Sequence, residues 1–292
     1  MTSPPPPSGQ SIHLNFDDAW DSAGLPMSTL DFRDWGPKLR YFAGAATLAE
    51  FDYQLPRSLP RFVLYGSGDF HHLTALWLRR ALSTMDGGAE IHLVSFDNHP
   101  DWDVRPPRWS CGSWINRAMD LPAVRQANVW GCGNFELKAP DRWFANRAAL
   151  RDGHLIVHPW AERYGATVQS RFECMSRDNW RYRFERFASG LARANVYVTV
   201  DLDCLRTEEA ATNWESGLFT AADVAWAMSE LKARSIIVGG DVCGAFSPPR
   251  CSGLFRRLSA WWDHPKTALP NAAEGRRVNL AALATIWPAL AT

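Results

Sequence analysis

Short apolar runs alternate with longer segments of helical periodicity along most of the chain. The short runs are rich in β-branched and aromatic residues, and most are apolar at every position, as strands buried on both faces of a sheet are. They predict strands at residues 61–66, 90–96, 128–131, 154–158, 195–200 and 235–238, the last of which continues to Gly240.

The segments between these runs repeat apolar residues every three or four positions, as a helix with one buried face does. Such series occur at Leu73, Leu76, Trp77 and Ala81, at Trp180, Phe184, Phe187 and Leu191, and at Val224, Met228 and Leu231. Thr220 and Asp223 have the spacing of a capping box before the last of these helices, and Gly153 stands where a helix is expected to end. The alternation predicts an α/β fold, a three-layer α-β-α sandwich with a mainly parallel sheet.

Residues 1–12 begin with a proline run among small polar residues, so we expect them to form a flexible Pro-rich tail. No low-complexity linker and no repeat period follows. We therefore expect residues 13–292 to form a single domain.

The composition narrows the class of function. The 31 Lys and Arg residues balance the 31 Asp and Glu residues, which argues against a nucleic-acid binder and against a polybasic membrane patch. No apolar stretch is long enough to span a membrane, and the N-terminus lacks the pattern of a signal peptide. The six cysteines are scattered without a C-x-x-C pair. We expect a cytoplasmic protein with reduced thiols that acts on a small molecule.

Acidic and histidine side chains follow four of the predicted strands. They are Asp69, His71 and His72 after the first strand, Asp97, His99, Asp101 and Asp103 after the second, Asp201 and Asp203 after the fifth, and Asp241 after the sixth. Because ligands of parallel sheets bind beyond the carboxyl ends of the strands, we expect these side chains to converge. Like charges repel at close range unless a cation neutralises them, so the sequence predicts a pair of divalent ions.

The ligand types narrow the choice of metal. Aspartates and histidines without thiolates suit Mn²⁺ or a related ion better than a structural zinc, which favours Cys and His. In an extended segment alternate side chains share a face, so Asp97, His99 and Asp101 can share one metal centre. Cys204 directly follows Asp203 and should point away from the ions.

The ordered motifs resemble those of the ureohydrolase family of arginase, agmatinase and formimidoylglutamase. They are the glycine-rich segment 66–72 that ends in Asp and His, D-N-H-P-D at 97–101, V-D-L-D at 200–203, and the loop 213–220 ahead of a predicted helix. The resemblance spans roughly residues 60–250. It implies the arginase-like fold and a metal-dependent hydrolase that acts on a non-peptide C–N bond.

Carried over residue by residue, the resemblance implies two Mn²⁺ ions per chain. His71, Asp97, Asp101 and Asp201 would bind one ion, and His99, Asp97, Asp201 and Asp203 the other. Two ions about 3.5–4 Å apart can hold a hydroxide that attacks a planar C–N carbon. Asp203 could accept its proton, and Asp241 or Glu215 could orient the substrate. The family often forms homo-oligomers, so the resemblance also implies a homo-oligomer.

Several positions depart from the family pattern. Phe70 separates Asp69 from the two histidines, so the spacing favours His71 as the ligand but leaves His72 and Asp69 open. The position of the family's proton-shuttle histidine is occupied by Trp114.

The substrate-binding positions differ as well. Asp103 stands where the family often has an amide that holds a carboxylate, which favours a cationic or neutral substrate. Ala245 occupies the spacing of the guanidinium-binding glutamate. We expect Asp103, Trp114 and Asn213 to contact the substrate, which would be a guanidino, amidino or related compound with a linear C–N bond.

Two alternatives remain at this point. One is a zinc-dependent deacetylase-like amidohydrolase of the related fold, which needs one ion. The other is a non-catalytic metal- or ligand-binding member of the arginase fold, suggested by Trp114 and Ala245. For the binuclear enzyme, the substitution Asp201→Ala should remove both ions and all activity.

Overall fold

An eight-stranded sheet runs through the computed structural model, which describes residues 10–85, 88–107, 109–265 and 271–291. The strands are β1 (Ser11–Asn15), β2 (Ser28–Asp31), β3 (Phe62–Leu64), β4 (Ile91–Phe96), β5 (Val124–Trp130), β6 (Leu155–His158), β7 (Asn195–Asp201) and β8 (Ile236–Cys243). Their order across the sheet is β2-β1-β3-β8-β7-β4-β5-β6, and every neighbouring pair is parallel. The predicted α/β class and parallel sheet are confirmed.

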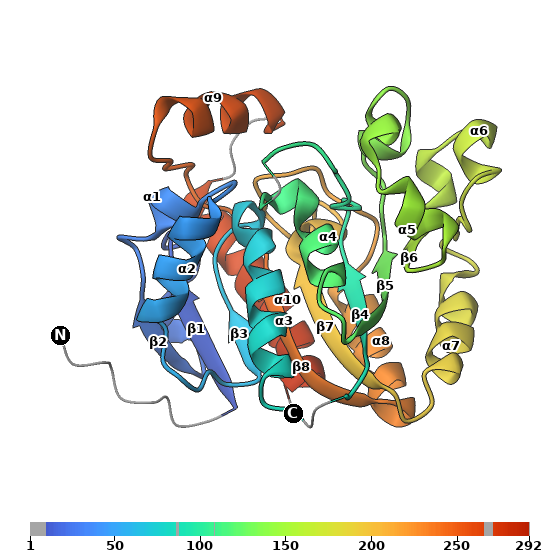
Figure 1. Cartoon of the computed structure of the whole chain (residues 1–292), viewed down its shortest axis with the longest axis horizontal. Helices are drawn as coiled ribbons and strands as arrows, with labels where there is room; N and C mark the ends of the chain where they lie inside the picture. Colours follow the sequence, from blue (N-terminus) through green and yellow to red (C-terminus); the bar gives the residue numbers. More distant parts are fainter. Residues whose placement is uncertain (1–9, 86–87, 108, 266–270, 292) are drawn as a thin grey trace.

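Helices cover both faces of the sheet, as Figure 1 shows. They are α1 (Gly36–Leu39), α2 (Ala45–Gln54), α3 (Thr74–Leu82), α4 (Trp114–Met119), α5 (Arg147–Arg151), α6 (Ala166–Gln169), α7 (Trp180–Gly190), α8 (Ala221–Arg234), α9 (Leu254–Asp263) and α10 (Ala272–Ala291). One buried apolar cluster joins the sheet to α2, α3 and α4, and a second joins it to α7, α8 and α10. The two cores on opposite faces make the three-layer sandwich that the sequence predicts.

The predicted strands are all present, with shifted ends. The largest functional consequence is at β8, which continues to Cys243 and therefore contains Asp241 instead of ending before it. The sequence missed β1 and β2, which are short and carry polar residues, so they lack the continuous apolar pattern. Strand β1 begins at Ser11, inside the range expected to be a tail, and residues 1–9 of that range lie outside the described residues.

Local signals at helix ends agree with the structure. Thr220 and Asp223 form a reciprocal capping box at the start of α8, as predicted. Gly153 follows α5 with a φ of +70°, a conformation that glycine adopts without strain. Helices α9 and α10 were not predicted. No helix in the described part of the chain has the length and apolar character needed to cross a membrane.

Candidate metal centre at the carboxyl edge of the sheet

Six buried side chains converge beyond the carboxyl ends of the central strands β4 and β7. They are His71, Asp97, His99, Asp101, Asp201 and Asp203, the set that the sequence predicts as metal ligands. The ends of β4 and β7 supply five of the six residues, and His71 comes from the 3₁₀ turn Gly68–Leu73 that follows β3. Sheet topology therefore brings together residues that lie far apart in the sequence.

One half of the cluster surrounds the ring of His71. Its Nδ1 atom lies 3.0 Å from Oδ2 of Asp97, 3.3 Å from Oδ2 of Asp101 and 3.5 Å from Oδ2 of Asp201. The other ring nitrogen, Nε2, lies 3.0 Å from Oγ1 of Thr199. Since Thr199 donates its own hydroxyl to Asp241 at 2.7 Å, it accepts a hydrogen from Nε2, and this tautomer leaves Nδ1 directed at the carboxylates.

The other half surrounds His99. Its Nδ1 atom lies 2.8 Å from Oδ2 of Asp203 and 3.6 Å from Oδ1 of Asp97. Backbone amides hold these acids, because the amide of His99 donates to Asp97 at 2.7 Å and that of Asn98 donates to Asp203 at 3.0 Å. Nε2 of His99 lies 3.3 Å from Oε2 of Glu215, so this carboxylate orients the ring from outside the cluster.

The charges of the cluster shift its pKa values in opposing directions. Burial lowers the pKa of His71, but hydrogen bonds to Asp101 and Asp97 outweigh it and the net pKa lies well above the usual range. Burial, reinforced by the charge of Asp97, raises the pKa of Asp101 to about 7. Burial also raises the pKa of Asp201 well above its usual value. Bound protons thus offset the negative charge of the clustered carboxylates. Divalent cations could offset it instead, because the nitrogen and oxygen atoms of the cluster are suitable metal ligands.

The backbone adopts positive φ angles at Asp101 and at Gly244, which packs against Asp201. Asp101 has a φ of +48°, a left-handed conformation that Asp tolerates better than most residues and that is concentrated at functional sites. Gly244 has a φ of +103°, and a Cβ atom there would lie 2.2 Å from Oδ1 of Asp201. Only glycine fits this approach, so the loop after β8 packs directly against the Asp201 carboxylate.

The structure also decides which of the residues after β3 is the candidate metal ligand. His71 lines the cavity at the cluster, whereas His72 and Asp69 are not among the described residues that line it. Asp69 instead accepts from Nε of the buried Arg40 at 2.6 Å and from Nε2 of His264 at 2.7 Å. Burial raises the pKa of Asp69, but the charges of His264 and Arg40 outweigh it and the net pKa lies below the usual range. Asp69 is therefore a structural ion-pair partner.

The cluster opens into a small cavity of about 30 Å³, room for an occupant the size of an ion or a water. Three side chains on its wall were not predicted: Cys111, Glu136 and Trp214. Oε2 of Glu136 is buried and makes no hydrogen bond with the described residues. Burial raises the pKa of Glu136 to about 8. Glu136 lies beyond the end of β5, so the strand-end rule could have identified it had the loop after that strand been considered.

Asp241 does not occupy the position that the sequence predicts for it. Because β8 extends beyond it, Asp241 lies inside the sheet, where its carboxylate accepts four hydroxyl groups: Tyr65 at 3.1 Å, Thr74 at 2.9 Å, Thr199 at 2.7 Å and Tyr197 at 2.8 Å. It is fully buried and connects to the cluster through Thr199. The expected contact between Asp241 and the substrate is therefore corrected.

The three expected substrate contacts also lie elsewhere. Asp103 pairs with Arg105 at 2.5 Å, away from the cavity. Trp114 is buried, donates its indole N–H to Oδ2 of Asp101 at 2.5 Å, and packs on the ring of His71 with centroids 4.7 Å apart. Asn213 bonds with both its amide atoms to the backbone of Ser247. Trp114 therefore supports two candidate ligands instead of forming a substrate wall, and Asp103 and Asn213 serve loop structure.

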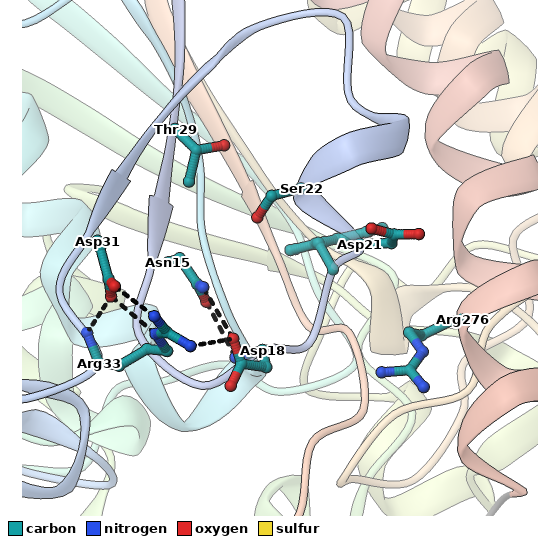
Figure 2. Close-up of a pocket in the computed structure, with 9 residues that line it drawn as sticks. Asn15, Asp18, Asp21, Ser22, Thr29, Asp31, Arg33 and Arg276 are labelled. Atoms are coloured by element: carbon teal, nitrogen blue, oxygen red, sulfur yellow. Dashed lines mark hydrogen bonds and ion pairs between the residues drawn. The ribbon is translucent and has the colours of Figure 1, made fainter.

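Two far larger cavities among the described residues lie away from the cluster. One, of about 590 Å³, is at the carboxyl ends of β1 and β2, where Figure 2 shows Arg33 between Asp18 at 3.6 Å and Asp31 at 2.5 Å. The other, of about 720 Å³, is beside the edge strand β6. Asp18 and Asp31 are thus paired with Arg33. We assign the chemistry to the smaller cavity because the candidate metal ligands gather there.

The parallel sheet with an Asp and His cluster at its carboxyl edge defines an α/β protein of the arginase-like fold. Among solved structures, arginase from Bacillus subtilis matches with a TM-score of 0.56 at 12% identity, over 95% of this chain and 98% of its own. Proclavaminate amidino hydrolase from Streptomyces clavuligerus matches with a TM-score of 0.55 at 14% identity, over 98% and 94%. A triple mutant of an arginase-like protein from T. brucei, bound with Mn²⁺, matches with a TM-score of 0.50 at 12% identity, over 95% and 91%.

Sequence comparisons give no such match. No family model matches the chain, and no curated protein matches it by sequence. The structural matches therefore confirm the fold that the motifs imply. Their sequence identity to this chain is too low for the sequence comparisons to detect.

Proposed function

We propose that this chain is a divergent ureohydrolase, a metal-dependent hydrolase of a linear C–N bond in a guanidino, amidino or related small molecule. The observation that carries the proposal is the buried cluster of two histidines and four aspartates, supplied in family order at the carboxyl edge of an arginase-like sheet. The continuous sheet supports the expectation that residues 13–292 form one metallohydrolase domain.

Two divalent ions, which we propose to be Mn²⁺, would be held by the two halves of the cluster. His71, Asp97, Asp101 and Asp201 would bind one ion, and His99, Asp97, Asp201 and Asp203 the other. The contacts of both histidines with the shared Asp97 support this assignment, as does the Mn²⁺ bound to the T. brucei neighbour. Two such ions supply Lewis acidity and lower the pKa of water.

The chain's own groups position the reactants and move protons. Asp203, which accepts a hydrogen bond from the amide of Asn98 and lies 2.8 Å from Nδ1 of His99, would accept the proton of the attacking water. Glu215 holds the ring of His99 through Nε2, so it acts on the substrate only by orienting this ligand. Trp114 in turn fixes Asp101.

Glu136 is the best candidate for contact with the substrate. It lines the same cavity as the metal ligands, and its buried Oε2 lacks a hydrogen-bond partner in the described residues. A buried carboxylate without a partner is costly, and an amidinium or amino group would supply both hydrogens and a compensating charge. This favours a nitrogen-rich, cationic substrate, which lies within the cationic or neutral class that the sequence predicts from Asp103.

The test is metal content per chain after loading with Mn²⁺ and dialysis, followed by a screen of guanidino and amidino compounds for release of urea or ammonia. We expect about two ions in the natural chain and none in Asp201→Ala, together with loss of turnover. Asp31→Ala is the control, because Asp31 pairs with Arg33 at the surface and should retain both ions.

Other outcomes separate the alternatives. One tightly held Zn²⁺ with amide hydrolysis would favour the deacetylase-like enzyme. Two ions without turnover of any compound in the screen would favour a non-catalytic binding protein. The absence of stoichiometric metal would overturn the proposed site.

A further inference from the structure

Cys243 places a thiol beside the metal cluster. Its Sγ atom lies 3.5 Å from Oδ2 of Asp201, and potential ligand atoms of His71, Asp201 and Cys243 all lie within 4.8 Å of one another. All three side chains are buried. The arrangement is therefore a potential three-residue metal site with one nitrogen, one oxygen and one sulfur ligand.

The position of Cys243 follows from the length of β8. In the register of β7 and β8, Cys243 pairs with Asp201, just as Asp241 pairs with Thr199. Alternate residues of a strand share a face, so Cys243 lies on the same face as Asp241, one step nearer the carboxyl edge. Gly244 then turns the chain against the Asp201 carboxylate. Strand and turn together hold the thiol at the cluster.

We propose that Cys243 is a ligand of the ion bound by His71 and Asp201. The inference rests on the proposed metal-dependent function and replaces Mn²⁺ by a zinc-like ion at this one position, leaving Mn²⁺ at the other. Upon coordination the thiol releases its proton to solvent and the sulfur binds as a thiolate. A thiolate favours Zn²⁺ or Co²⁺ over Mn²⁺, which prefers oxygen ligands. The ion at this position is therefore a zinc-like ion, whereas the position at His99 and Asp203 keeps nitrogen and oxygen ligands alone.

The other buried cysteines provide a control. Cys132 is as completely buried as Cys243, and it belongs to none of the candidate ligand groups found in the described residues. The substitutions Cys243→Ser and Cys132→Ser each remove one buried sulfur atom. Only the first should change the metal centre.

The experiment uses Co²⁺ as the probe, because a thiolate bound to Co²⁺ produces a sulfur-to-cobalt charge-transfer band in the near ultraviolet. We expect this band in the natural chain and in Cys132→Ser, and its loss in Cys243→Ser while the content of Co²⁺ is retained. In competition between Zn²⁺ and Mn²⁺, Cys243→Ser should shift the preference toward Mn²⁺ by at least about tenfold.

The spectrum of the natural chain tests the inference even if the variant does not fold. Two bound Co²⁺ ions without the charge-transfer band would overturn the role of Cys243 and leave the proposed function intact. A band that persists in Cys243→Ser would assign the sulfur ligand to another cysteine and also overturn it. Failure of the natural chain to bind Co²⁺, Zn²⁺ or Mn²⁺ would overturn both the proposed function and this inference.

Discussion

Thr199 connects the ring of His71 to the buried carboxylate of Asp241. The hydrogen bonds run from Nε2 of His71 to Thr199 and from the Thr199 hydroxyl to Asp241. Partners of this kind fix the tautomer and the orientation of a histidine that binds metal through its other nitrogen. At the scale of single residues, the site therefore depends on groups that do not touch the cavity.

Thr199→Val tests this connection, because valine keeps the shape of threonine and removes the hydroxyl. We expect the affinity for a divalent ion at the His71 position to fall by about tenfold or more, measured by titration calorimetry with Zn²⁺ and with Mn²⁺. Tyr197→Phe is the control, since it removes a different hydroxyl from Asp241 and leaves Thr199 in place. An equal loss of affinity in both variants would show that general damage to the buried network is the cause.

Arg40 is a second residue outside the cavity on which the site depends, because it pairs with buried carboxylates next to the cluster. Its side chain is 1% exposed and contacts Asp69 at 2.6 Å and Asp17 at 3.5 Å. Arg40→Met would remove the guanidinium from the buried Asp17 and leave Asp69 with its bonds to His264 and Trp214, so we expect a loss of about 3–5 kcal/mol in the free energy of unfolding.

Urea denaturation measures this loss. The matched variant is Arg33→Met, which breaks exposed ion pairs with Asp18 and Asp31 and should cost far less than Arg40→Met. Similar costs for the two arginines would contradict the interpretation that burial makes the Arg40 pairs essential.

At the scale of elements, α9 differs from the other helices. Figure 1 shows it apart from the two helical layers, at the top of the view. Its contacts with the body include the buried Ala260, the guanidinium of Arg256 on the backbone of Phe42, and His264 just after the helix on Asp69. All of its large apolar side chains are exposed: Leu254, Phe255, Leu258, Trp261 and Trp262.

We predict that α9 opens locally more often than α8 or α10, because few of its apolar side chains are buried. Hydrogen exchange measured by mass spectrometry should show faster deuterium uptake at Leu254–Asp263 than at Ala221–Arg234. His264→Ala, which removes the contact with Asp69, should speed exchange in α9 further. Protection of α9 equal to that of α8 would contradict this prediction.

The sequence predicts elements well where burial is uniform. The apolar runs that became β4 and β7 are buried on both faces, so their pattern is unambiguous. Strand β2 carries Ser28, Thr29 and Asp31 and is partly exposed at the edge of the sheet, so its pattern gives no such signal. The end of β8 was placed too early because Asp241 is charged. Only the hydroxyls that gather around it allow a carboxylate inside the sheet.

At the scale of the whole molecule, buried neutral histidines link stability to pH. Burial lowers the pKa of His158 from 6.5 to about 3, and that of His13 from 6.5 to about 4. In the unfolded chain both rings regain an ordinary pKa, so the unfolded state binds more protons in the interval between the two values. The free energy of unfolding therefore falls as the pH drops below about 6.5.

His158→Gln tests the sign. The ring of His158 stacks on Trp130 with centroids 3.7 Å apart, so the variant should be less stable than the natural chain at pH 8. Its stability should then decline less steeply on acidification, by up to about 1.4 kcal/mol per pH unit. Urea midpoints between about pH 8 and pH 5 measure both effects. Parallel curves for the two proteins would contradict a depressed pKa for His158.

The sequence by itself determined the parallel α/β class and the five residues of the cluster that lie at the ends of β4 and β7, whereas the structure selected His71 over His72 and Asp69. Both depend on local signals, since apolar runs define buried strands and the residues after a strand lie at its carboxyl edge. The tertiary structure decided which side chains face the cavity. Trp114, Asp241 and Asn213 make their contacts with residues distant in sequence, and the alignment of Cys243 with Asp201 depends on how β8 pairs with β7. Such pairings depend on packing between elements, which the local pattern of one strand does not specify.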